Sequence, residues 1–153
     1  MIYDEVQYTK NDWRNRNRIK TPNGLQWLTV PVKTAGLFGQ QIKDVEIAGE
    51  EWAHLHWKAI EQNYSRSPHF HDVAEFLWPI YRESANLRLA QLNRRLIQAI
   101  CGFLDIGASI TDSTKYRAEG GKTEKLVEIC VRAAAQVYVS GPAAKGYLDT
   151  KLF

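Results

Sequence analysis

A row of cationic side chains near the start of the chain sets the strictest limit on how that segment folds. The row consists of Arg14, Arg16, Arg18 and Lys20, which occupy alternate positions. Alternate side chains of an extended strand project from the same face, so all of these charges would lie together. A buried face could not hold them unpaired. The row therefore predicts a strand face that is either solvated or covered by an anion.

Polar and aromatic residues surround this row in a mixture that suits ligand recognition better than a hydrophobic core. In an anion clamp, the cations would contact phosphates and the neighbouring amides would donate hydrogen bonds. A solvated strand face explains the same charges without a ligand, and both interpretations remain open. The residues expected to bind an anionic small-molecule substrate in this segment are Gln7, Tyr8, Lys10, Arg14, Asn15, Arg16, Asn17 and Arg18.

Composition indicates a globular protein of one domain. The chain has 153 residues, of which 44% are hydrophobic and 24% charged, which is typical of a domain with a real core. No apolar run reaches the ~20 residues of a membrane helix, so no membrane insertion is expected. The net charge of +3 is concentrated in residues 10–20. This patch is shorter than the basic surface of a nucleic-acid-binding protein, which argues against a nucleic-acid partner.

The cysteines and histidines form no recognisable metal-binding pattern. Cys101 and Cys130 both lie in apolar helical patterns, so we expect buried, reduced thiols. Two cysteines and four histidines fit no spaced zinc motif, and no cofactor is identified. A cytoplasmic protein is the default prediction.

The order of apolar patterns predicts a mixed α/β fold over residues 1–153. Strands are expected over 25–32, 42–47, 108–111 and 136–140, and helices over 52–63, 73–82, 86–107 and 124–135. Residues 14–47 would form a small antiparallel or mixed β unit near the N-terminus. A strand, a helix and a strand joined by short connections favour a parallel pair. We therefore expect a mainly parallel sheet flanked by helices.

Both ends of this fold are expected to be incomplete. Met1–Tyr3 runs directly into acidic residues, as the last part of a buried parallel strand often does. Residues 147–153 stop on an apolar, helical pattern. The sequence is therefore predicted to be a fragment.

Two glycine turns are further candidates for ligand contacts. The first consists of Gly120, Gly121, Lys122 and Thr123, and the second of Ser140 and Gly141, followed by Tyr147. The first is not a phosphate-binding P-loop, because that motif needs a glycine where this chain has Tyr116. A helix N-terminus can still attract an anion, although a simple loop-to-helix cap remains the alternative. The second turn either binds a ligand at the end of a strand or only makes room for the backbone.

His56 is the histidine that stands out. It lies on the predicted inner face of a helix beside Trp52 and Ile60. A histidine in that position is either an acid–base catalyst or a hydrogen-bonded core residue.

Several unusual sequence words occur together and in order along the chain. They include Tyr3-Asp4-x-Val6-Gln7-Tyr8, Trp13-Arg14-Asn15-Arg16-Asn17, Trp27-Leu28-Thr29-Val30-Pro31-Val32, His56-Trp57, Gly120-Gly121-Lys122-Thr123 and Ser140-Gly141. This pattern resembles the WbqC-like proteins, bacterial proteins associated with O-antigen and other surface-polysaccharide gene clusters. The resemblance covers nearly all of the chain. Members usually have a strand and turn before the first word and a further segment after the last, which again implies a chain incomplete at both ends.

The resemblance, the cation row and the glycine turns together suggest a transferase of lipopolysaccharide or other surface-glycan biosynthesis. Its donor would be activated and anionic, such as a nucleotide-linked sugar or an acyl or aminoacyl donor. His56 or Asp4 would supply acid–base chemistry, and the glycine turns would hold a second group. A non-catalytic binding or assembly protein of the same pathway is the alternative. A nucleotidyltransferase-like ligase or a nucleic-acid module comes third.

Overall fold

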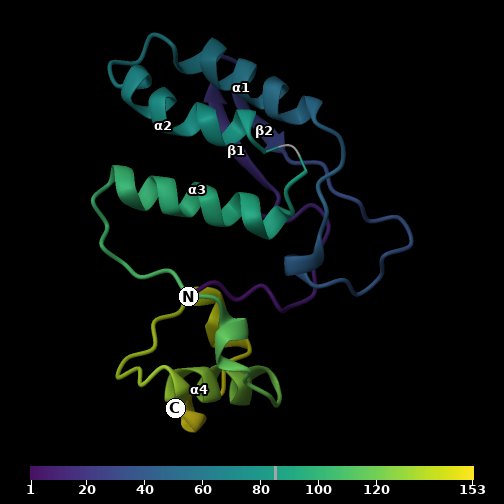
Figure 1. Ribbon diagram of the computed structural model, residues 1–153, viewed down its shortest axis with the longest axis vertical. Coiled ribbons are helices and arrows are strands. Elements are labelled where there is room, and N and C mark those ends of the chain that lie inside the picture. The colour runs from purple at the N-terminus through teal and green to yellow at the C-terminus, as the bar shows by residue number, and fades with distance from the viewer. Residues whose placement is uncertain (85) are drawn as a thin grey trace. The chain divides into compact units, whose positions relative to one another are not determined.

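The computed structural model describes residues 1–84 and 86–153, and its architecture is mixed α/β (Figure 1). The chain divides into two compact units, a larger unit of residues 4–108 and a smaller unit of residues 1–3 and 109–153. The elements are β1 (Arg16–Thr21), β2 (Gly24–Thr29), α1 (Glu51–Tyr64), α2 (Phe70–Arg82), α3 (Leu89–Phe103) and α4 (Lys122–Arg132). Short 3₁₀ turns η1 to η4 cover Ile42–Asp44, Ser113–Tyr116, Pro142–Gly146 and Thr150–Leu152.

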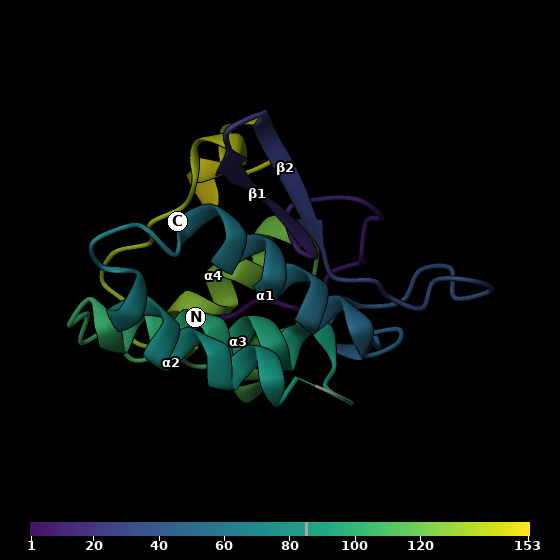
Figure 2. The ribbon, with the colours of Figure 1, turned by 90° about the horizontal axis from the view of Figure 1, so that it is seen from above.

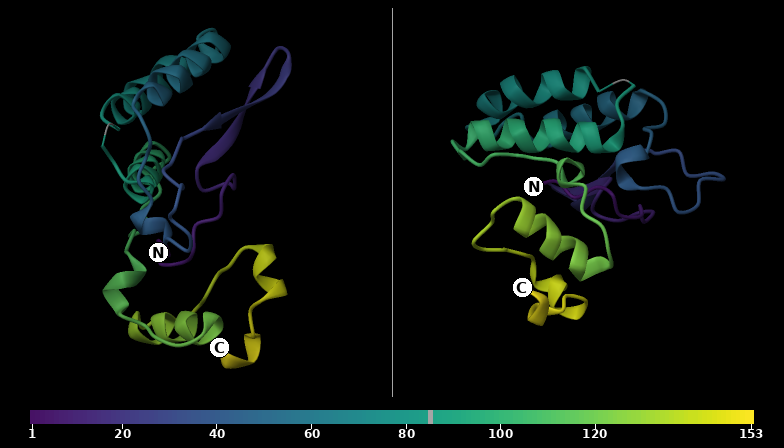
Figure 3. Two further views of the ribbon diagram at one scale, coloured as in Figure 1. Left: turned by 90° about the vertical axis from the view of Figure 1, so that its right-hand side faces the viewer. Right: turned by 60° about the horizontal axis from the view of Figure 1, so that its bottom comes forward.

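Strands β1 and β2 form an antiparallel hairpin, as the left view of Figure 3 shows. The two-residue turn between them is fixed by Thr21, whose hydroxyl donates to the Gly24 carbonyl at 2.9 Å and accepts from the Asn23 amide at 3.2 Å. Gly24 has a φ of +109°, which a residue with a Cβ rarely adopts. The small antiparallel β unit expected near the N-terminus is therefore confirmed.

The three helices of the larger unit lie side by side (Figure 2). Helix α2 packs against both α1 and α3, and α1 also packs against β1. Aromatic side chains fill the space between α1 and α2, with the Trp57 and Trp78 ring centroids 5.0 Å apart and Tyr81 beside Trp52. Helix α2 continues one turn beyond Pro79, because a proline that near the end removes only one helical hydrogen bond.

A second cluster of buried residues holds the segment before the hairpin. Tyr8, Ile42, Val45 and Leu89 form this cluster, and Val45 and Leu89 are completely buried. The Leu89 amide donates to the Val45 carbonyl at 2.9 Å, which ties the start of α3 to the same core. This core positions Tyr8 and the residues that follow it.

The mainly parallel sheet expected from the sequence is not found in the described residues. Apart from the hairpin, the described chain contains only isolated bridges, and one of these, between Ile2 and Asp112, is parallel. Residues 42–47 form a 3₁₀ turn and single bridges instead of a strand. Residues 136–140 form no described strand, because no neighbouring backbone pairs with them, and Val137 and Val139 are 76% and 85% exposed.

Helix limits also differ from the sequence prediction. Helix α3 ends at Phe103, before Gly107, because Asp105 adopts a left-handed φ of 52°. Helix α4 ends at Arg132, and Ala134 with a φ of 50° turns the chain away. In place of the helical pattern expected over residues 147–153, the chain forms one short 3₁₀ turn, η4. Cys101 and Cys130 are free thiols and half-buried.

Candidate anion-binding face of the hairpin

Strand β1 carries most of the cation row on one face of the hairpin. Arg16, Arg18 and Lys20 lie opposite Thr29, Trp27 and Leu25 of β2, so these residues share a face. The other face carries Ile19 and Leu28, which are half-buried where the hairpin packs against α1. The cationic face is therefore the face left toward solvent.

Trp27 supports two of these cations. The guanidinium carbon of Arg16 lies 4.3 Å from the centroid of the Trp27 ring, and that of Arg18 lies 5.1 Å away. The ring attracts both charges and partly offsets their mutual repulsion. Trp27 nevertheless remains 50% exposed, so a ligand can reach this part of the surface.

Arg14 differs from the rest of the row because it has a carboxylate partner. It precedes β1, and its guanidinium forms an ion pair with Asp12. The Arg14 amide donates to the same carboxylate at 2.8 Å. Within the described residues, no ion pair neutralises Arg16, Arg18 or Lys20. Three uncompensated positive charges thus share one strand face.

The turn before β1 is held in place from several directions. Asn11 begins it in the left-handed region, with a φ of 58°, which asparagine tolerates better than most residues. The Asn15 amide donates to the Asp12 carbonyl at 3.3 Å, and the Asn93 side chain of α3 donates to the Arg14 carbonyl at 3.0 Å. These bonds fix the segment that carries Trp13, Arg14 and Asn15.

Three buried polar atoms near this turn lack hydrogen-bond partners among the described residues: Tyr8 Oη, Asn15 Oδ1 and Arg16 Nε. The other polar side-chain atom of Asn15 has a partner, since Nδ2 donates a hydrogen bond to the Val30 carbonyl at 2.9 Å. Burial raises the pKa of the Tyr8 hydroxyl above 10.0, and the Asp12 carboxylate adds to the effect. Three groups oppose this rise in the pKa of Tyr8. They are the positive charges of Arg14 and Arg16 and the backbone amide of Asn11, which lies near the hydroxyl without forming a hydrogen bond to it. Unpaired buried polar groups are costly and rare in native proteins, and a functional role is one explanation for them.

The other residues predicted for this segment have varied surroundings. The backbone of Gln7 forms an isolated antiparallel β-bridge with Gln41, and the Asp4 carbonyl accepts a hydrogen bond from the Lys43 amide at 3.0 Å. Lys10 is exposed. Asn17 is also exposed, and its side-chain oxygen accepts from the Arg18 amide at 2.8 Å.

His56 lies inside the larger unit, among aromatic rings. It is 7% exposed, and its ring packs edge-on against Trp52 with centroids 5.2 Å apart. Its Nε2 lies 3.1 Å from the Thr29 carbonyl, so that nitrogen carries the proton and donates. This bond, together with the one from the Lys20 amide to the Tyr64 hydroxyl at 2.9 Å, fastens the hairpin to α1.

The position of His56 predicts a loss of stability in acid. Burial lowers the pKa of His56 below 6.5, and the Thr29 carbonyl raises it in part. The unfolded chain therefore binds a proton on His56 before the folded chain does, so the unfolding free energy should fall as the pH drops below about 6.5. Urea denaturation at pH 7.5 and 5.5 measures the loss. His56→Gln, which keeps an N–H donor and does not titrate, should lose less; an equal loss would contradict this assignment.

In the smaller unit, a carboxylate covers the first glycine turn. Gly121 is the N-cap of α4, and a Cβ built on it would lie 2.5 Å from Oε2 of Glu124. The side chain of Glu124 thus folds back over the helix N-terminus, where a carboxylate is favourable. Thr123 is buried, and its hydroxyl accepts from the Asp149 amide at 3.2 Å. This bond joins the first turn to the segment that contains Tyr147.

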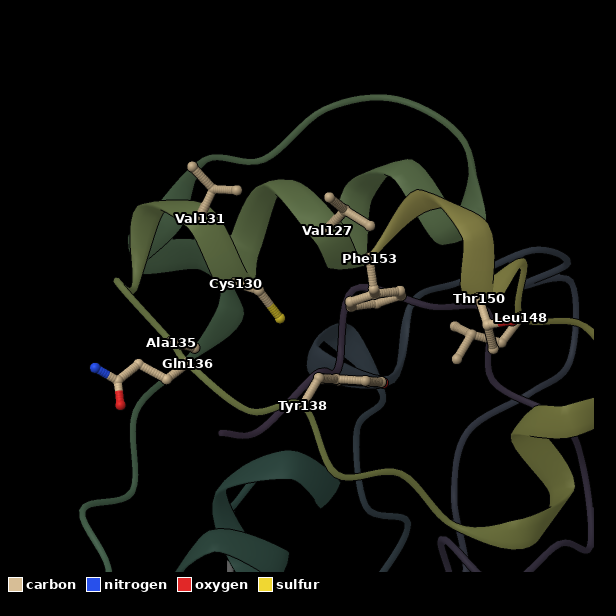
Figure 4. A pocket seen from close by; sticks show the side chains of 9 residues that line it. All are labelled: Val127, Cys130, Val131, Ala135, Gln136, Tyr138, Leu148, Thr150 and Phe153. Atoms are coloured by element: carbon tan, nitrogen blue, oxygen red, sulfur yellow. The ribbon is translucent and has the colours of Figure 1, made fainter.

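The smaller unit also contains an apolar cavity that the sequence interpretation missed. Its volume is about 350 Å³, and its walls come from α4 and the segments after it (Figure 4). Tyr138 and Phe153 stack in one wall, with ring centroids 4.9 Å apart. The lining residues are Val127, Cys130, Val131, Ala135, Gln136, Tyr138, Leu148, Thr150 and Phe153. Ser140 and Gly141 do not line it; they lie in the exposed connection that leads into η3.

The chain matches a known protein family over its whole length. The WbqC-like protein family matches over residues 1–153. The chain belongs to the WbqC-like protein family. This WbqC-like chain is 52% identical over 153 residues to the "Uncharacterized protein Rv1507c" of Mycobacterium tuberculosis (strain ATCC 25618 / H37Rv). The match covers 100% of this chain and 66% of the mycobacterial protein, just under two thirds of its length. No solved structure matches the chain.

The family words fall in both units of the WbqC-like chain. The cation row, Tyr8 and His56 belong to the larger unit, whereas both glycine turns belong to the smaller one. Outside Ala85, no group of three or more His, Cys, Asp or Glu side chains is placed to hold a metal ion. Among the described helices, none is both long enough and apolar enough to span a membrane.

Proposed function

We propose that this WbqC-like chain is part of a transferase of bacterial surface-glycan biosynthesis, and that its hairpin binds the activated, anionic donor. One observation carries the proposal: Arg16, Arg18 and Lys20 share a strand face without a carboxylate partner among the described residues. An anion on this face would relieve their repulsion and accept charge-assisted hydrogen bonds. Guanidinium groups are suited to phosphate and carboxylate oxygens.

The remaining predicted residues take supporting parts in the proposal. Gln7, which is exposed, would hydrogen-bond the polar body of the donor, and Lys10 would add positive charge. Asn17 lies beside Leu28 on the face of β1 opposite Arg16 and Arg18, so we assign it no contact with this donor. His56 or Asp4 would supply acid–base chemistry. Burial lowers the pKa of His56 and so favours the neutral imidazole, which is the form that a general base requires. In the smaller unit, the turns at Gly120–Thr123 and Ser140–Gly141 would bind a separate polar ligand.

A non-catalytic assembly protein of the same pathway is the second candidate. The observation that favours it is the apolar surface of the smaller unit, where Val131, Val137 and Val139 are all more than 70% exposed. Exposed apolar side chains such as these can contribute to a protein interface. Such a protein would use its anion-binding face to recognise a glycan or a partner enzyme without turning it over.

A binding screen of this chain tests the proposal. The ligands are UDP- and dTDP-sugars, ATP, coenzyme A and a single-stranded oligonucleotide, each titrated calorimetrically at low and high salt. We expect at least one small anionic donor to bind, more weakly at high salt because the charges are at the surface. Binding of the oligonucleotide alone, with a steep salt dependence, would favour the nucleic-acid module. Binding of none of the ligands would contradict the proposal and favour the assembly protein.

A further inference from the structure

Trp13 is a large, exposed aromatic side chain that directly precedes the cation row in the sequence. Its side chain is 79% exposed, more than that of Trp27 at 50%. The guanidinium carbon of Arg14 lies 5.0 Å from the centroid of the Trp13 ring. An exposed indole that is supported by a cation is a suitable platform for a second planar group.

Arg14 is better suited to support this ring than to bind an anion. Its positive charge is already paired with Asp12, and its amide donates to the same carboxylate. Its carbonyl accepts from Asn93 of α3, which anchors the turn to a long helix. The charge of Arg14 is thus neutralised, whereas Arg16 and Arg18 pack on Trp27 without a carboxylate partner among the described residues. This segment therefore has two parts: the Trp13 ring, which Arg14 supports, at one end, and the unpaired cations Arg16 and Arg18 along the strand.

We infer that the donor is a nucleoside diphosphate derivative whose base stacks on Trp13 while its phosphates lie against Arg16 and Arg18. This inference rests on the proposed anion-binding function of the hairpin. Trp13 lies three residues before Arg16 in the chain, so the ring and the cations come from one continuous segment. A nucleoside diphosphate carries a planar ring and two adjacent charges on one short molecule, which matches this order. An acyl or aminoacyl donor without a base has no planar group for the ring.

Calorimetric titration with four ligands tests the inference: UDP, ADP, pyrophosphate and glucose 1-phosphate. Stacking of a base on an aromatic side chain strengthens binding by roughly 5- to 150-fold. We expect UDP or ADP to bind more tightly than pyrophosphate by a factor in this range. In Trp13→Leu this preference should disappear while the affinity for pyrophosphate stays unchanged, and Trp13→Phe should restore part of it. The matched control is Phe38→Leu, since Phe38 is 97% exposed in a loop.

The outcomes separate this inference from the proposal beneath it. Equal affinities for pyrophosphate and both nucleotides would overturn the inference and leave the anion-binding face intact. An unchanged nucleotide preference in Trp13→Leu would also overturn it. If glucose 1-phosphate binds more tightly than pyrophosphate and this preference depends on Trp13, the ring stacks on a sugar instead of a base. That result would also overturn the inference. Failure of all four ligands to bind would overturn the proposed function, and the inference with it.

Discussion

Replacing Leu89 with alanine is expected to lower the free energy of unfolding of the larger unit by about 3–5 kcal/mol. Leu89 is completely buried and packs in one cluster with Tyr8, Ile42 and Val45. Removal of its side chain leaves a cavity between α3 and the segment that precedes the hairpin, and both lost burial and the cavity are costly. A loss of this size is a large part of the stability of an ordinary domain.

Tryptophan fluorescence during urea denaturation measures this loss in the larger unit alone. All five tryptophans, Trp13, Trp27, Trp52, Trp57 and Trp78, lie in residues 4–108. The matched control is Ile97→Ala on the same helix, because Ile97 is 43% exposed and should cost much less. Similar losses in the two variants would show that Leu89 is not in the core of this unit.

The second large effect is expected from Arg16→Gln and Arg18→Gln, each of which should weaken binding of the anionic donor about 10-fold or more. Hydrogen bonds to charged groups contribute about 1.5–3 kcal/mol, and each glutamine removes one charge from the face. Arg16→Lys should recover only part of the loss, because an ammonium keeps the charge but lacks the planar fork. Calorimetry with the best ligand of the screen measures these changes.

Lys58→Gln is the control for a general effect of charge. Lys58 is an exposed cation on α1, outside the hairpin, so its removal changes the net charge by the same amount. Its effect on affinity should be small, since exposed charges beyond the binding face are screened by salt. If Lys58→Gln weakens binding as much as Arg16→Gln, the attraction is to the whole protein and not to β1.

The hairpin and its charged face could be predicted from sequence because both depend on local chemistry. The turn at Pro22 and Asn23 sets the register, and the period of two in the cation row sets the face. The same register places Trp27 opposite Arg18, so this contact could have been found from the turn alone. The pairing of Arg14 with Asp12 is harder to predict, because both residues lie in a turn whose backbone, including the left-handed Asn11, is not specified by the alternating pattern.

The expected parallel sheet depended on contacts between distant segments, which a sequence pattern does not specify. Residues 136–140 have the composition of a strand, yet a strand needs a partner backbone to complete its hydrogen bonds. Residues 42–47 alternate as a strand would, but Ile42 and Val45 serve the core from a 3₁₀ turn and the residue after it. The fold-back of Glu124 over Gly121 likewise depends on a rotamer that the sequence does not fix.

The most direct test of the anion-binding face is an NMR titration of the ¹⁵N-labelled chain with pyrophosphate. The account predicts the largest shifts at the backbone amides of β1 and at the side-chain Nε–H groups of Arg16 and Arg18, saturating together. Amides at the start of α4, where Glu124 already covers the turn, should change little. Shifts confined to residues 120–123, or no saturable shift in β1, would contradict the account.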